Sequence, residues 1–238
     1  MYGVFVTGTD TGVGKTLFSA ALLLRLGAAG VHAAACKPVA AGCRRERGRL
    51  VNEDAELLAR FAPAQSPLEI VNPVALEPAI APHVAAAEAG LRLDAAALAA
   101  ACRRAAAGAD YLVVEGAGGW RVPLGPDSTL AAVAIELGLP VVLVVGLRLG
   151  CLNHALLSAA AIRADGLPLA GWVANPLDPE MPRREENIAT LIHHLGAEPL
   201  ARLPACNGTT EADRARQAAA ALPGDIAARL RAAGSPPA

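Results

Sequence analysis

The chain alternates between short, strongly apolar runs and longer segments whose apolar residues recur at helical spacing. The short runs have the length of strands, which we expect at residues 2–6, 31–36, 111–115, 140–145, 169–174 and 200–203. The longer segments predict helices at residues 17–26, 53–61, 94–107, about 129–137, about 153–163, 183–195 and, with interruptions, up to 232. Each strand is followed by helical sequence, the order typical of a parallel sheet covered by helices.

This order predicts an α/β fold with a parallel β-sheet and helices on both faces. The run at 140–145 is nearly continuous and β-branched, as in a strand buried on both sides. We find no internal repeat and no low-complexity linker, so we expect a single domain over residues 1–238. The last residues, 233–238, are expected to form a frayed tail.

Two stretches lack a clear period. Residues 42–52 carry four arginines, and we expect an irregular, mobile, solvated loop there. Asn52, at the end of this stretch, is a suitable N-cap for the helix at 53–61. Residues 62–82 contain five prolines and predict a long ordered loop, a kind of segment that often carries function in compact domains.

Composition narrows the class of protein. A formal net charge of −1 at pH 7 provides no basic surface for nucleic acid or an anionic membrane. No apolar run is long enough to span a bilayer, and no charged segment with a cleavage site opens the chain, so we expect a cytoplasmic protein. The five cysteines form no C-x-x-C pair and are expected to be small buried residues. They are Cys36, Cys43, Cys102, Cys151 and Cys206.

The stretch from Gly8 to Thr16 reads Gly-Thr-Asp-Thr-Gly-Val-Gly-Lys-Thr and lies between the first predicted strand and helix. Glycines there allow backbone N–H groups to approach an anion, and the following helix adds its unpaired N–H groups and positive dipole end. Lys15 would contact the β- and γ-phosphates of a nucleotide, and Thr16 would bind Mg²⁺. One residue more than in the standard motif separates Gly8 from Gly14, which leaves an ordinary glycine turn as the alternative. The motif favours a P-loop NTPase-like sheet.

Two further residues lie at the carboxyl ends of predicted strands, the edge at which open α/β sheets bind ligands. Lys37 follows the strand at 31–36 and either faces the ligand or is a solvated charge. Glu115 ends the next predicted strand, where a Walker-B metal site requires an acid. The alternative is a helix-capping or ion-paired glutamate. The glycine-rich residues 116–119 would allow the backbone to approach the γ-phosphate.

Two other polar groups are candidates for ligand binding. Asn175 follows the strand at 169–174, and its donor and acceptor suit the edge of an adenine. An Asn before Pro176 is equally typical of a turn. The helix start near Asn153 presents N–H groups that could hold a carboxylate.

Five motifs follow one another along the chain. They are the stretch from Gly8 to Thr16, Cys36-Lys37-Pro38-Val39, Val-Val-Glu-Gly-Ala-Gly-Gly-Trp at 113–120, Leu-Gly-Cys-Leu-Asn-His at 149–154 and Gly-Trp-Val-Ala-Asn at 171–175. In this order and spacing they resemble the dethiobiotin synthetase family. The resemblance covers residues 4 to about 204, and the C-terminal segment is only loosely similar.

The resemblance implies a ligase of biotin biosynthesis that joins 7,8-diaminopelargonic acid, CO₂ and ATP into dethiobiotin, ADP and phosphate. In this family a substrate amine takes up CO₂ as a carbamate, which attacks the γ-phosphate to give a carbamic-phosphoric anhydride. The second amine then closes the ring. The cofactors implied are Mg²⁺ and the co-substrate ATP.

The resemblance also implies roles for individual residues. Lys15 and Lys37 would hold the γ-phosphate and carbamate oxygens, with Thr11 reaching the transferred group. The metal ligands would be Thr16, Asp54 and Glu115. The nucleotide contacts would be Gly12, Val13, Gly14, Lys15, Thr16, Leu17, Asp54, Glu115, Gly116, Ala117, Gly118, Asn175, Pro176, Pro204, Ala205, Cys206 and Glu211.

The family is homodimeric, with the substrate at the interface and its carboxylate held by the helix start of the partner. The substrate contacts implied are Lys37, Ala41, Gly150, Cys151, Leu152 and Asn153. Ala41 departs from the family, which usually has a Ser or Thr hydroxyl there. We therefore expect a weaker KM for the diamine with catalysis retained.

A second class of P-loop protein is the alternative, namely the partitioning or septum-positioning switch ATPase. These proteins have a signature lysine early in the phosphate loop, where this chain has Asp10. The sequence also contains no basic patch and no amphipathic membrane tail, so it favours the ligase.

Overall fold

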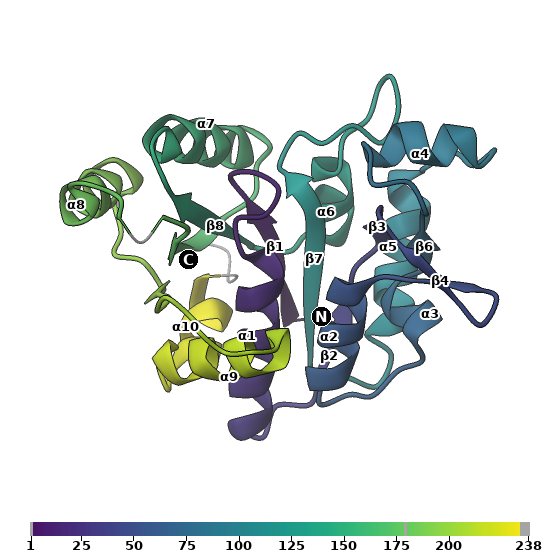
Figure 1. Cartoon of the computed structure of the whole chain (residues 1–238), viewed down its shortest axis with the longest axis horizontal. Helices are drawn as coiled ribbons and strands as arrows, with labels where there is room; N and C mark the ends of the chain where they lie inside the picture. Colours follow the sequence, from purple (N-terminus) through teal and green to yellow (C-terminus); the bar gives the residue numbers. More distant parts are fainter. Residues whose placement is uncertain (1, 179, 234–238) are drawn as a thin grey trace.

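The computed structural model describes residues 2–178 and 180–233 of the 238-residue chain. Its centre is a six-stranded sheet in the order β10-β9-β8-β1-β7-β2, and all neighbouring pairs are parallel (Figure 1). The strands are β1 (Tyr2–Gly8), β2 (Ala33–Cys36), β7 (Tyr111–Gly119), β8 (Val141–Leu147), β9 (Leu169–Pro176) and β10 (Ala201–Arg202). All six predicted strands are confirmed.

Helices cover both faces of this sheet (Figure 1). One face is covered by α1 (Lys15–Ala28), α2 (Glu53–Phe61), α9 (Glu211–Ala221) and α10 (Ile226–Ala233). The other is covered by α4 (Pro82–Glu88), α5 (Ala95–Ala105), α6 (Ala131–Leu137), α7 (Cys151–Ala164) and α8 (Arg184–Leu195). The short helix α3 (Leu68–Val71) contacts the edge strand β2.

The two hydrophobic cores arise from the alternation of side chains along each strand. In β1, Val4 and Val6 pack into the core beneath α1, whereas Phe5 packs into the core beneath α6 and α7. Every residue of β8 is buried. Burial of each such aliphatic side chain stabilises the fold by roughly 1.5–3 kcal/mol, so the central strands are held from both faces as predicted.

The charged stretch at 42–52 is exposed as predicted, but it is not irregular, and that part of the prediction is wrong. It forms an antiparallel hairpin of β4 (Arg44–Glu46) and β5 (Arg49–Val51). The turn between the strands uses positive φ angles, 48° at Arg47 and 79° at Gly48. The side chains of this hairpin are mostly exposed, so hydrophobic alternation gave no indication of it.

The proline-rich stretch at 62–82 contains more regular structure than predicted. It includes α3 and β6 (Val74–Ala75), which pairs with β3 (Val39–Ala40) in a separate two-stranded sheet. Pro82 begins α4, an unpredicted helix, because its missing N–H needs no partner in the first turn.

Three further predictions concern helix ends and the C-terminus. Asn52 caps α2, since its Oδ1 accepts a hydrogen bond from the backbone N of Ala55 at 3.2 Å. The helix predicted at about 129–137 begins at Ala131, with Leu130 at its N-cap and no side chain capping it. Residues 234–238 of the predicted tail lie outside the described residues.

The parallel strands direct their carboxyl ends to one edge of the sheet. The segments that follow β1, β2, β7 and β8 therefore meet at that edge, and they contain most of the predicted site residues. None of the helices within residues 2–178 and 180–233 is long and apolar enough to cross a membrane.

Candidate active site at the carboxyl edge of the sheet

The loop between β1 and α1 has the form of a phosphate-binding loop. Gly12 and Gly14 adopt positive φ angles of 72° and 92°, which favour glycine. A Cβ atom on Gly14 would also collide with the side-chain amide of Asn175. α1 begins at Lys15 with no side chain capping its first turn. The backbone N–H groups of that turn are thus free of a side-chain cap, as an anion site requires.

Lys15 is buried against this loop, and its Nζ donates a hydrogen bond to the backbone O of Asp10 at 2.9 Å. Burial lowers the pKa of Lys15 to about 8, and the nearby charge of Lys37 acts in the same direction, although Glu115 and Asp54 oppose both. Phosphate oxygens beside this group would favour its charged form. The geometry and the pKa therefore suit a lysine that contacts an anion.

Lys37 lies between two carboxylates. Its Nζ is 2.6 Å from Oε1 of Glu115 and 2.9 Å from Oδ2 of Asp54. The register of β2 and β7 places Cys36 opposite Val114, so the next residues, Lys37 and Glu115, lie side by side. The solvated alternative for Lys37 is wrong, and Glu115 is ion-paired.

The backbone around Lys37 is fixed by the segment after α3. The N–H of Lys37 donates to the carbonyl of Val71, and the side-chain amide of Asn72 donates to the carbonyl of Lys37, both at 2.7 Å. Asn72 is itself buried. These bonds hold the base of the lysine side chain in place.

The pKa values of Lys37 and Asp54 both favour the charged form of the side chain. Burial alone would lower the pKa of Lys37, but the charges and hydrogen bonds of Glu115 and Asp54 raise it above its usual value. Burial would raise the pKa of Asp54, yet the ammonium of Lys37 holds it below its usual value. One ammonium thus neutralises part of the charge of two carboxylates.

The residues predicted to bind metal fit a magnesium ion. The hydroxyl of Thr16 donates to Oε1 of Glu115 at 2.9 Å. Asp54 and Glu115 both form an ion pair with Lys37. Glu115 is fully buried, and its Oε2 has no hydrogen-bond partner. Mg²⁺ prefers oxygen ligands and usually keeps waters or phosphates. Among the described residues no group of three or more His, Cys, Asp or Glu side chains could hold a metal, so the Thr16 hydroxyl and substrate oxygens would be needed.

A cavity of about 830 Å³ opens beside these groups. Its walls bring together residues from α1, α2, α4, α9 and the segments after β1, β2 and β7. The predicted site residues that line it are Thr11, Gly12, Gly14, Lys15, Thr16, Leu17, Lys37, Ala41, Asp54, Ala117, Gly118 and Glu211.

Other predicted residues lie outside this cavity. Val13 is buried in the core, and Glu115 and Gly116 lie in β7. Asn175 is a buried strand residue, not part of a turn, and its Nδ2 donates to the carbonyl of Val13 at 2.8 Å. Pro176 follows it in β9, and Pro204, Ala205 and Cys206 lie in the segment between β10 and α9.

The helix start predicted to bind a carboxylate is also separate from the cavity. Gly150 is the N-cap of α7, followed by Cys151, Leu152 and Asn153 in its first turn. No side chain caps this end, and the preceding Leu149 is 97% exposed. The start of α7 is therefore accessible to a neighbouring molecule.

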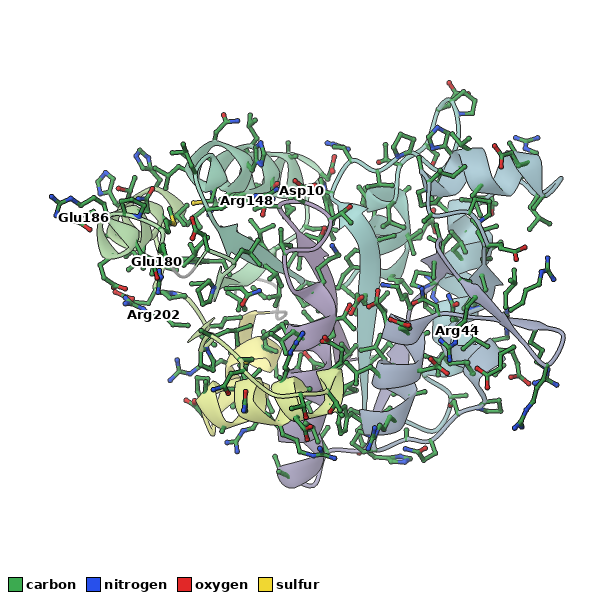
Figure 2. All side chains as sticks on the ribbon, in the orientation of Figure 1. Asp10, Arg44, Arg148, Glu180, Glu186 and Arg202 are labelled. Atoms are coloured by element: carbon green, nitrogen blue, oxygen red, sulfur yellow. The ribbon has the colours of Figure 1, made fainter. Side chains whose placement is uncertain are left out.

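Sequence reasoning missed several residues of the site. The cavity wall includes residues 79–82, Val122 and Pro123. Of these, only residues 79–82 lie in a stretch that the sequence had marked, namely the proline-rich one. Asn72, which fixes Lys37, had none. Arg148 also had none, and its guanidinium lies 2.6 Å from Oδ2 of Asp10 in the phosphate loop (Figure 2).

Comparison with known proteins identifies the family of the chain. A model of the AAA domain family matches residues 2–213. The ATP-dependent dethiobiotin synthetase BioD of Pseudomonas paraeruginosa is 56% identical over 205 residues, 86% of this chain and 90% of that protein. The BioD of Cellvibrio japonicus is 54% identical over 200 residues, 84% and 88% of the two chains. The chain belongs to the dethiobiotin synthetase family.

Solved structures place this member of the dethiobiotin synthetase family among P-loop proteins. The MinC:MinD cell division complex of Aquifex aeolicus gives a TM-score of 0.57 at 15% identity, over 100% of this chain and 98% of that one. A ParA family ATPase of Chlorobium tepidum gives 0.54 at 13% identity, over 98% and 96%. At such low identity these likenesses show the fold alone, and they confirm the P-loop NTPase-like α/β class.

Proposed function

We propose that this protein is an ATP-dependent cyclo-ligase that converts 7,8-diaminopelargonic acid and CO₂ to dethiobiotin in biotin biosynthesis, with release of ADP and phosphate. The observation that carries the proposal is that two lysines, one carboxylate and one hydroxyl line a single cavity at the end of the phosphate loop; they are Lys15, Lys37, Asp54 and Thr16. The buried carboxylate of Glu115 lies directly behind them, 2.6 Å from Lys37. Identity of 52–56% to proteins named as dethiobiotin synthetases supports the substrate assignment.

Phosphoryl transfer to a carbamate requires that two anionic groups meet. The γ-phosphate and the carbamate repel each other, so cations must hold both. Lys15 is positioned by the phosphate loop and Lys37 by the end of β2, and both line the cavity. Thr11 lies in the same loop, where its hydroxyl can reach the transferred group. The protein therefore supplies positioning and positive charge, while the second amine closes the ring and expels phosphate.

The metal and nucleotide would be held at the same edge. Thr16, Asp54 and Glu115 would hold Mg²⁺, which supplies additional positive charge at the phosphates when bound. The loop residues 12–17 would surround the phosphates, with residues 116–118 close by. Asn175 and Pro176 would border the adenine together with residues 204–206, and Glu211 would lie near the ribose. The Nδ2 of Asn175 also holds the loop.

We propose a homodimer that works in the cytoplasm, with the whole chain acting as one domain. The nine-carbon substrate would lie against Ala41 in the cavity, and residues 150–153 of a second copy would hold its carboxylate. Support comes from the uncapped start of α7 and from the large exposed side chains of Leu149 and Leu157 near it. Apolar side chains exposed in this way are typical of an interface.

ATP turnover tests the proposal directly. Release of ADP should require both the diamine and bicarbonate, and dethiobiotin should form in equal amount. A switch ATPase of the partitioning type would hydrolyse ATP at a rate indifferent to both additions. That second result would replace the ligase assignment with the switch.

A further inference from the structure

Lys37 contacts the residues that are proposed to hold the metal. Its Nζ lies 2.6 Å from Glu115 Oε1 and 2.9 Å from Asp54 Oδ2, and the hydroxyl of Thr16 donates to the same Glu115 oxygen. The ammonium therefore occupies the place between the two carboxylates that a cation would take. A divalent ion that reaches these oxygens must first displace it.

Basic and acidic side chains occur in equal number beside the cavity. The ammonium of Lys37 lies 2.9 Å from Asp54 and 2.6 Å from Glu115, and Lys15 lines the same cavity as Lys37 and Asp54. A free divalent ion would add positive charge beside two ammonium groups, whose repulsion is strong in a partly buried site. A nucleotide brings several negative phosphate oxygens with the metal. The complex of metal and nucleotide is therefore not repelled by the two ammonium groups.

The backbone of Lys37 is held in place, and its long side chain ends beside the cavity. The backbone N–H of Lys37 donates to the carbonyl of Val71, and the backbone carbonyl of Lys37 accepts from the side-chain amide of Asn72. Four methylene groups separate the Cα of Lys37 from the ammonium, and the residue lines the cavity. Its ammonium can thus leave the carboxylates for phosphate oxygens that enter the cavity.

We propose that Lys37 determines the specificity of the metal site by excluding free divalent ions, so that the site accepts its metal only together with the nucleotide. This inference rests on the metal ligands of the proposed function. It assigns to Lys37 a second role, distinct from its contact with the reacting groups. The consequence is that a metal without nucleotide does not assemble an incomplete active site.

Binding of Mn²⁺ alone, measured by EPR titration, provides the first test. The wild type should leave Mn²⁺ free, whereas Lys37→Met should bind it at least about tenfold more tightly, because a neutral side chain neither occupies nor repels the site. Lys15→Met is the matched control. It removes a lysine from the same cavity that forms no ion pair among the described residues, and its gain should be clearly smaller.

Two outcomes of this titration would overturn the proposal. One is a wild type that binds Mn²⁺ as tightly as Lys37→Met does. The other is a gain in Lys15→Met equal to that in Lys37→Met, which would show a general field effect instead of displacement at the carboxylates. The double variant Lys37→Met/Glu115→Gln must lose the gain, because the new ion would need the Glu115 carboxylate.

Thermal unfolding of the wild type keeps the inference testable if Lys37→Met does not fold. Mg²⁺ alone should leave the Tm of the wild type unchanged, while Mg²⁺ with a non-hydrolysable ATP analogue should raise it. A rise with Mg²⁺ alone, equal to that with both, would refute the inference. Dethiobiotin formation by the same preparation reports on the proposed function separately, so either can fail without the other.

Discussion

The buried cluster around Lys37 and the arginine hairpin of β4 and β5 contain ion pairs of nearly equal length. Lys37 lies 2.6 Å from Glu115, and on the hairpin Arg45 lies 2.7 Å from Glu77. Glu115 is 0% exposed, whereas the side chain of Arg45 is 64% exposed. Water and salt compete with the second pair but not with the first, so equal distances correspond to very different energies.

The two regions consequently have different tasks. The ion pairs of the hairpin connect an exposed polar element to its neighbours. Arg44 (Figure 2) contacts Glu56 of α2, and Arg45 contacts Glu77, which precedes the cavity wall at 79–82. The buried cluster instead concentrates charge where water is scarce. Such charge can act on a substrate, and its removal leaves an unpaired partner behind.

The largest effect should come from Lys37→Ala. We expect kcat for dethiobiotin formation to fall by about a thousandfold, because a desolvated cation that faces the developing charge is removed, while nucleotide still binds. The measurements are steady-state kinetics and calorimetry with an ATP analogue. Lys37→Arg is the control that keeps the charge. An undiminished rate in Lys37→Ala would contradict both the site and the contrast with the hairpin.

The next effect concerns stability. Glu115→Gln should lower the free energy of unfolding by about 3 kcal/mol, since it leaves the buried ammonium of Lys37 with one carboxylate. Asp54→Asn should cost about 1 kcal/mol, because the Asp54 side chain is 45% exposed. Urea unfolding without added metal gives both values. Equal losses of unfolding free energy in the two variants would show that burial does not make the Glu115 pair stronger than the Asp54 pair.

Ala41 lies along the chain between the two regions and should give a smaller effect. Ala41→Ser restores the hydroxyl that the family resemblance implies, and one hydrogen bond contributes about 0.5–1.5 kcal/mol. KM for the diamine should therefore fall by roughly two- to tenfold with kcat unchanged. Ala41→Val is a control that fills space without a donor. An unchanged KM in Ala41→Ser would mean that another group already makes this contact.

The smallest effect is expected on the hairpin. Arg45→Ala should change the free energy of unfolding by no more than about 1 kcal/mol, and this difference should shrink further in high salt. Arg47→Ala is the matched control, because Arg47 forms no ion pair among the described residues of the hairpin. A loss comparable to that of Glu115→Gln would remove the distinction between the buried and exposed pairs.

The elements that the sequence predicted well are those with a strong local signal. β8 is a continuous β-branched run, and the glycines before Lys15 predicted the turn that the positive φ angles show. The hairpin had no such signal, because its strands are three residues long and largely exposed. Its contacts come from Glu56 and Glu77, which only the folded chain brings near.

The candidate site shows the same division. Lys15, Thr16 and Glu115 were predictable because each follows or ends an element in a recognisable pattern. In the structure Lys15 and Thr16 line the cavity, and the hydroxyl of Thr16 donates to Glu115. Asn72 and Arg148 were not, because their partners are a backbone carbonyl and a carboxylate from remote segments. Nothing in the spacing of these residues indicates such contacts.

The sequence by itself determined the order along the chain of the six central strands and of most helices, together with the phosphate loop, because periodicity and glycine conformations act over short distances. The tertiary structure decided which charges meet. The parallel register of β2 with β7 sets Lys37 beside Glu115, and packing of α2 on the sheet brings Asp54 to the same ammonium. Burial and these charged neighbours together set the pKa values of Lys37 and Asp54, and both are properties of the assembled fold, not of any local stretch.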